Sequence, residues 1–185
     1  MTTPVSLVPA SRFFRPARLS ETSVLLAVAW LVPFAVHLVP WSGPRPLGVY
    51  LLPMFWTTFV AAYFYGARTA VIVGLFAPLL NALLTGSPAW RSLGVTSFEI
   101  VAFALLTTLA LRHRPRWVIV AALGYVGARV AAALLLVATG VLGDLGSPVN
   151  YVQRALVNGL AGFAVLTAIN LALIRFYPRP EQPAA

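Results

Sequence analysis

The sequence has no cysteine, no lysine, two histidines and four acidic residues among 185. Without cysteine there is no disulfide framework, thiolate metal site or thiol nucleophile. The chain is instead 60% hydrophobic and only 9% charged, and its mean hydropathy of +0.88 lies far from the average of soluble domains. The sequence therefore predicts a membrane protein.

Six apolar stretches approach the roughly 20 residues that a helix needs to cross the hydrocarbon core. Breaks such as YGAR and RHRPR, made of turn formers or arginines, separate them. Ser20 is expected to cap the first helix. We expect an all-α bundle of six transmembrane helices at residues 21–40, 46–65, 67–86, 94–111, 117–140 and 150–175.

The arginines predict the orientation of this bundle. Nine of the thirteen fall on the N-terminal side, against Arg45 and Arg91 in the opposite connections. The positive-inside rule then places both termini in the cytoplasm. We expect residues 1–20 to form a basic cytoplasmic arm, 21–176 a six-span transmembrane domain and 177–185 a Pro-rich cytoplasmic tail.

Polar side chains within or beside the spans form the candidate site. An ionisable group costs about 2.5–3.5 kcal/mol at a helix centre on insertion scales, so it normally faces the bundle interior or a wet cavity. All the candidates are expected in the outer half of the bilayer, which predicts a ligand pocket that opens outward. They are His37, Trp41, Asn81, Trp90, Glu99, Arg129, Tyr151, Arg154 and Asn158.

Most of the candidates also have a purely structural explanation, and the sequence leaves both explanations open. Glu99 and Arg129 would form an ion pair between two helices, and Asn81 and Asn158 would make interhelical hydrogen bonds worth about 0.6 kcal/mol or somewhat more each. The aromatic candidates would belong to the belt that lines a membrane interface. Only the shared depth of the set favours the pocket.

Small residues recur at four-residue spacing in two stripes, and such stripes let helix backbones approach closely in lipid. One stripe is Gly66, Ala70 and Gly74. The other, Ala164, Ala168 and Ala172, lies in the inner half of the last predicted span. We interpret this second stripe as a docking face for a partner helix.

Residues 50–90, YLLPMFWTTFVAAYFYGARTAVIVGLFAPLLNALLTGSPAW, resemble the middle of the substrate-binding S components of energy-coupling factor (ECF) transporters. The similar features are a Pro-containing span, the YGAR turn, a Gly-spaced span and a Pro-containing outer loop. SFEIVAFALLTTLALRHR resembles the next helix of that family, whose early Glu corresponds to Glu99, and ALVNGLAGFAVLTAINLALI resembles its last span.

This resemblance covers about half of the chain. It implies a multi-pass subunit of the bacterial cell (inner) membrane that captures a vitamin or related micronutrient from outside. It also implies partners, namely a membrane T component and two ATPase subunits.

Catalysis finds little support in the sequence, which has no phosphate-binding Gly-rich loop with lysine and no paired-histidine metal motif. His37 and His113 are expected on opposite sides of the membrane, which argues against a haem or metal between them. The scattered arginines form no basic face for nucleic acid. We expect neither an enzyme nor a cofactor. The alternative is a non-catalytic scaffold or accessory subunit of a membrane complex, similar to the cell-shape subunit MreD.

Overall fold

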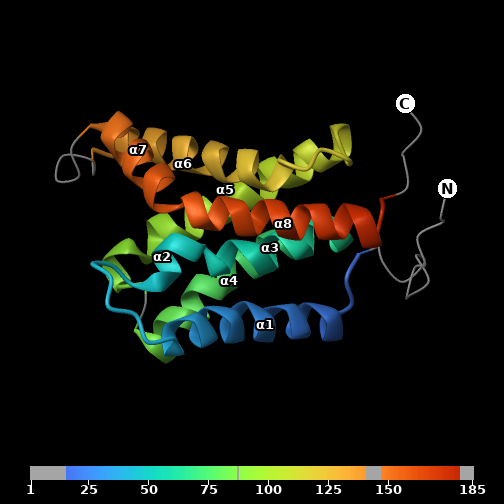
Figure 1. Cartoon of the computed structure of the whole chain (residues 1–185), viewed down its shortest axis with the longest axis horizontal. Coiled ribbons are helices and arrows are strands. Elements are labelled where there is room, and N and C mark those ends of the chain that lie inside the picture. Colours follow the sequence, from blue (N-terminus) through green and yellow to red (C-terminus); the bar gives the residue numbers. More distant parts are fainter. Residues whose placement is uncertain (1–15, 87, 141–146, 180–185) are drawn as a thin grey trace.

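The computed structural model describes residues 16–86, 88–140 and 147–179, and within them the chain forms helices and no strands. The helices run back and forth along the longest axis of the molecule (Figure 1). They are α1 (Leu19–Leu38), α2 (Leu47–Leu51), α3 (Pro53–Tyr65), α4 (Ala67–Thr85), α5 (Trp90–His113), α6 (Val120–Ala138), α7 (Pro148–Asn158) and α8 (Leu160–Phe176). Most of the predicted basic arm and of the Pro-rich tail lies outside the described residues.

Each predicted span coincides with a helix or with a broken pair of helices. Within the described residues, four helical stretches are long and apolar enough to cross a membrane, namely Leu19–Leu38, Leu47–Tyr65, Ser92–His113 and Val120–Ala138. The pair α7 and α8 makes a fifth if its bend of 62° lies within one span, whereas the described apolar part of α4, Ala67–Leu83, is shorter than these. The described residues therefore have the architecture of a helical membrane protein with four or five candidate spans.

The second predicted span is broken at Leu52. Leu52 has a φ of 57°, which non-glycine residues rarely adopt, and Pro53 begins α3, where its missing N–H costs no helical hydrogen bond. The Leu52 side chain lies against α8, since a Cβ atom added at Gly162 would be 2.5 Å from Leu52 Cγ. The packing of Leu52 against Gly162 stabilises the unusual backbone conformation of Leu52.

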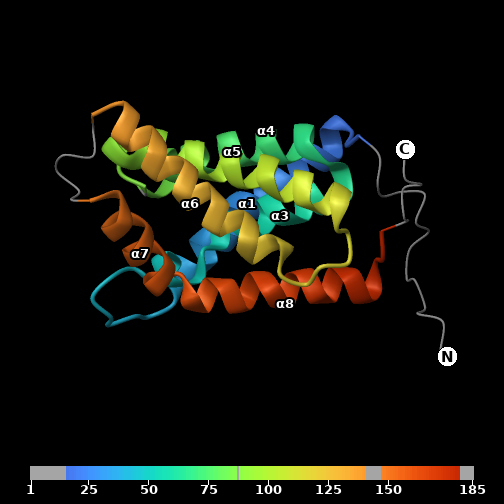
Figure 2. The same ribbon diagram turned by 90° about the horizontal axis from the view of Figure 1, so that it is seen from above.

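The last predicted span bends at Gly159, the residue between α7 and α8. The start of α7 is specified locally, because the Ser147 hydroxyl accepts a hydrogen bond of 3.2 Å from the Asn150 backbone N–H and Pro148 occupies the first helical position. Figure 2 shows α7 crossing one end of the bundle at an angle to α8.

The core lies around α3, most of whose residues are buried, and extends to where α5 packs between α4 and α6. Small residues let α4 and α6 pack closely against α5. A Cβ atom added at Gly74 would be 3.0 Å from the Ile100 side chain, and one at Gly124 would be 2.2 Å from Thr107 Oγ1. Ala70, in the first predicted stripe, is fully buried. Gly74 of that stripe is buried as well, whereas Gly66 forms the turn between α3 and α4, where an added Cβ atom would meet nothing within 4 Å.

Helix α1 begins differently from the prediction. Its cap residue is Arg18, whose backbone N–H donates to the Glu21 carboxylate at 2.8 Å. The prediction that Ser20 caps the helix was wrong, because Ser20 already lies within α1. The carboxylate of Glu21 accepts the hydrogen bond of the Arg18 N–H instead. Its negative charge also interacts favourably with the positive end of the helix dipole.

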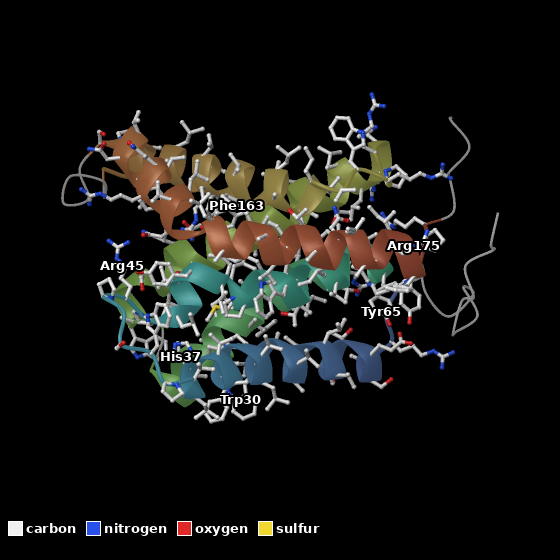
Figure 3. The ribbon with its side chains drawn as sticks, viewed as in Figure 1. Trp30, His37, Arg45, Tyr65, Phe163 and Arg175 are labelled. Carbon is white, nitrogen blue, oxygen red and sulfur yellow. The ribbon has the colours of Figure 1, made fainter. Side chains whose placement is uncertain are left out.

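The described ends of the chain lie at the same end of the bundle (Figures 1 and 2). This end, here called the arginine-rich end, also holds the turn at Gly66 and the α5–α6 connection at 114–119. The opposite end, here called the distal end, holds residues 39–46, residues 88–89 and the start of α7. Figure 3 shows Arg175 at the arginine-rich end and His37 and Arg45 at the distal end.

Candidate functional site

Glu99 on α5 is the centre of a polar network near the distal end. Its side chain is almost completely buried, with 3% of the residue exposed. One oxygen, Oε1, accepts hydrogen bonds from Arg129 Nη1 on α6 and from the Tyr151 hydroxyl on α7. A buried charge is tolerated when a partner and hydrogen bonds compensate it. This carboxylate therefore joins three helices.

Arg129 is held on its other side by Tyr125, one turn earlier on α6. Arg129 Nε donates to the Tyr125 hydroxyl at 2.8 Å, and the guanidinium carbon lies 4.9 Å from the centre of the Tyr125 ring. Tyr125 is fully buried between Phe55 and Phe163, whose ring centres are 5.0 and 5.2 Å away. The guanidinium is thus fixed in position before any ligand binds.

A cavity of about 180 Å³ lies beside this network, with Arg129 in its lining. His37 and Pro33 of α1 form one wall, while Leu52 and Phe55 form another. His37 Nδ1 lies 2.7 Å from the Pro33 carbonyl oxygen, which can only accept, so Nδ1 is the donor of this hydrogen bond. The cavity therefore combines apolar walls with a cation and an imidazole.

Arg154 and Asn158 lie in a different cleft at the distal end. This cleft has a volume of about 350 Å³ and is lined by Arg45, Asn150, Gln153, Arg154, Val157 and Asn158. Arg154 is exposed, and Asn158 is half-buried. Of the predicted site residues, His37 and Arg129 thus line one pocket, the Arg129 cavity, and Arg154 and Asn158 line another, the Arg45–Arg154 cleft.

The remaining predicted site residues make other contacts. Asn81 is 1% exposed, and its side-chain amide donates to the carbonyls of Ala29 on α1 at 3.3 Å and Ala77 at 2.9 Å. Trp41 is 51% exposed and donates its indole N–H to the Arg45 carbonyl at 2.8 Å. Trp90, at the start of α5, is 64% exposed. Asn81 joins helices, and both tryptophans lie at the distal surface, as interfacial residues do.

The predicted docking stripe faces away from the bundle. Ala164, Ala168 and Ala172 are all exposed on α8. Ala70, at the same spacing in the first stripe, is buried instead, so the spacing of small residues alone does not determine their burial.

Two residues of these networks were not predicted. Tyr125 lies four residues before Arg129, a spacing that places both side chains on one helix face, and this was the available signal. Asn170 on α8 is fully buried, and its amide donates to the carbonyls of Trp117 at 2.9 Å and Val118 at 2.6 Å. Its signal was the same as that of Asn81, an asparagine in an apolar run.

Comparisons with known proteins identify no relative: no family model, no curated protein and no solved structure matches the chain. The candidate site is therefore defined by the geometry of the chain's own side chains and cavities.

Proposed function

We propose that the chain is a substrate-capture subunit of an ECF-type importer, which binds a vitamin or related micronutrient in an outward-facing pocket. The observation that carries this proposal is the position of Arg129. Its guanidinium is oriented by Glu99 and Tyr125 and lines the apolar cavity at the distal end. Pre-oriented polar groups in a mainly apolar pocket are typical of small-molecule sites.

In this proposal all six predicted spans cross the bacterial cell membrane, with α4 as a short crossing and α7–α8 as a bent one. The arginine-rich end faces the cytoplasm, which the positive-inside rule favours, and the distal end faces outward. Because the chain has no native cysteine, single cysteines test this orientation without background. Ser42→Cys should react with an impermeant thiol reagent on intact cells, and Ala67→Cys should not. The reverse labelling pattern would show that the bundle has the opposite orientation.

The cavity restricts the chemistry of the ligand. An arginine carries five N–H donors, and Arg129 uses Nε for Tyr125 and Nη1 for Glu99. The remaining donors suit an anionic or hydrogen-bond-accepting group, and Phe55 and Pro33 suit an apolar or aromatic part. The volume of about 180 Å³ is below the range of drug-sized pockets. We infer that the cavity takes a compact ligand or one end of a larger one.

The proposed partners are a membrane T component and two ATPase subunits, which would supply the energy for import. This part rests on the resemblance to ECF S components. It is also supported by the outward alanine stripe at Ala164, Ala168 and Ala172, because exposed small residues permit close packing of a partner helix.

A second function, the non-catalytic scaffold, is favoured by the fact that the Glu99 network is made of hydrogen bonds within the protein. Arg129 and Tyr151 both bond to Glu99, so these side chains connect α5, α6 and α7 even without a ligand. In a scaffold the network would only join helices, and the cavity would stay without a specific occupant.

The experiment that separates the two functions uses Gly48, which lines the Arg129 cavity. The atom nearest to a Cβ added there belongs to the His37 ring and is 3.4 Å away, so alanine fits. The larger leucine would extend into the cavity. Protein purified from native membranes is denatured, and released small molecules are identified by mass spectrometry. Wild type and Gly48→Ala should release the same compound, and Gly48→Leu should release none. Equal release from a folded Gly48→Leu, or no specific compound from wild type, would favour the scaffold.

A further inference from the structure

Two clefts meet on α7, and both lie outside the proposed capture cavity. One is the Arg45–Arg154 cleft. The other is an almost wholly apolar groove of about 610 Å³ between α6 and α7. Leu134 and Val130 of α6 and Val149 and Val152 of α7 are among the residues that line this groove, which we call the α6–α7 groove. Gln153 and Val157 line both clefts, so the polar cleft and the apolar groove adjoin along these two side chains of α7.

The sequence of α7 explains this arrangement. Val149, Val152 and Leu156 recur at spacings of three and four residues and form one face of the helix, which lines the groove. Asn150, Arg154 and Asn158 recur every four residues and form the opposite face, which lines the cleft. Since α7 is bent by 62° from α8, the distal part of the proposed bent crossing is an amphipathic helix with one apolar and one polar face.

The arginines of the cleft carry uncompensated charge within the described part of the chain. No acidic side chain lines the cleft, and neither Arg45 nor Arg154 forms an ion pair with a described residue. Asn150, Gln153 and Asn158 add amide donors. Guanidinium and amide groups are the side-chain donors that bind phosphate oxygens.

The loop that carries Arg45 is held in place. The Trp41 indole donates to the Arg45 carbonyl at 2.8 Å, and the Trp41 ring lies over Gly43, where an added Cβ atom would be only 2.3 Å from the indole nitrogen. Any side chain at Gly43 would displace the ring. The backbone of Arg45 is therefore positioned for the cleft by local contacts.

We propose that these two adjoining clefts bind one anionic phospholipid, which in the orientation proposed above belongs to the outer leaflet. Its headgroup phosphate lies between Arg45 and Arg154, and one acyl chain lies in the α6–α7 groove. A free phosphate would leave the groove unfilled, and a lipid without net charge would leave the arginines uncompensated. Basic clefts beside membrane helices recognise anionic headgroups through the same chemistry. This site is separate from the Arg129 cavity.

The test is native mass spectrometry of the purified full chain in detergent. The probes are phosphatidylglycerol, phosphatidylcholine with the same acyl chains and glycerol phosphate. Wild type should retain phosphatidylglycerol at least tenfold better than phosphatidylcholine, and equimolar glycerol phosphate should not displace it. Arg45→Gln with Arg154→Gln should abolish the preference. Arg175→Gln, which removes an exposed arginine at the arginine-rich end (Figure 3), should retain it.

A second variant tests the groove. Val149→Trp fills it at an interfacial position, where tryptophan is tolerated, and should reduce phosphatidylglycerol retention about tenfold. Leu160→Trp, a substitution at a similarly exposed position on α8, should not. Gly48→Leu, which blocks the capture cavity, should also leave lipid retention unchanged. Equal retention of the two lipids, displacement by glycerol phosphate, or unchanged retention in the double glutamine variant with an unaltered melting temperature would each overturn the proposal.

Discussion

Arg129 and Arg154 lie near the same end of the molecule, in contrasting surroundings. The side chain of Arg129 is 17% exposed and is bonded to Glu99 and Tyr125. Arg154 is exposed and faces Arg45 across an open cleft with no acidic residue in its lining. The first charge is compensated within the protein and fixed in place, whereas the second is available to an external anion. Burial and pairing, more than residue type, decide what an arginine does here.

The largest expected effect is at Glu99. Glu99→Gln removes the negative charge and leaves Arg129 uncompensated, which typically costs about 3–5 kcal/mol for a buried pair. The melting temperature in detergent should fall clearly. Arg154→Gln is the matched control at the exposed arginine, where a surface substitution usually changes the free energy of unfolding by less than about 0.5 kcal/mol. Equal melting temperatures for the two variants would remove the contrast between the two regions.

The second-largest expected effect on stability is at Gly162, which packs against Leu52 in the lining of the Arg129 cavity. Gly162→Leu would place side-chain atoms where Leu52 now lies, and overpacking of this kind costs about 1–3 kcal/mol. Melting temperature is again the measurement. Gly94→Ala is the control, since a Cβ atom there meets nothing within 4 Å. A Gly162→Leu variant as stable as Gly94→Ala would show that the cavity wall adapts freely.

The smallest expected effect on stability is at Ala168, on the outward face of α8. Ala168→Leu should change the free energy of unfolding by less than about 0.5 kcal/mol because the site is exposed. It should nevertheless weaken co-purification with a T component and ATPase subunits, since the larger side chain keeps a partner helix away. Co-purification equal to wild type would exclude this stripe as the docking face.

The helices were predictable because apolar runs and turn formers mark them directly. Glu99 and Arg129 were also predictable as polar side chains in apolar spans. The breaks at Leu52 and Gly159 were not predicted, because Pro53 and Gly159 alone do not fix a break and the observed breaks depend on the packing of Leu52 against Gly159 and Gly162. Arg45 was interpreted only as a sign of topology, since nothing local indicates that it meets α7 across the distal end.

The Glu99–Arg129 pair offers the most direct test of capture at the Arg129 cavity. The measurement is the amount of micronutrient released from purified Glu99→Leu/Arg129→Leu protein, with its melting temperature as the control for folding. Replacing both members of a buried pair with apolar residues is often close to neutral for stability. The account predicts a double variant that melts close to wild type and releases no compound. A double variant that is stable and releases as much compound as wild type would contradict it.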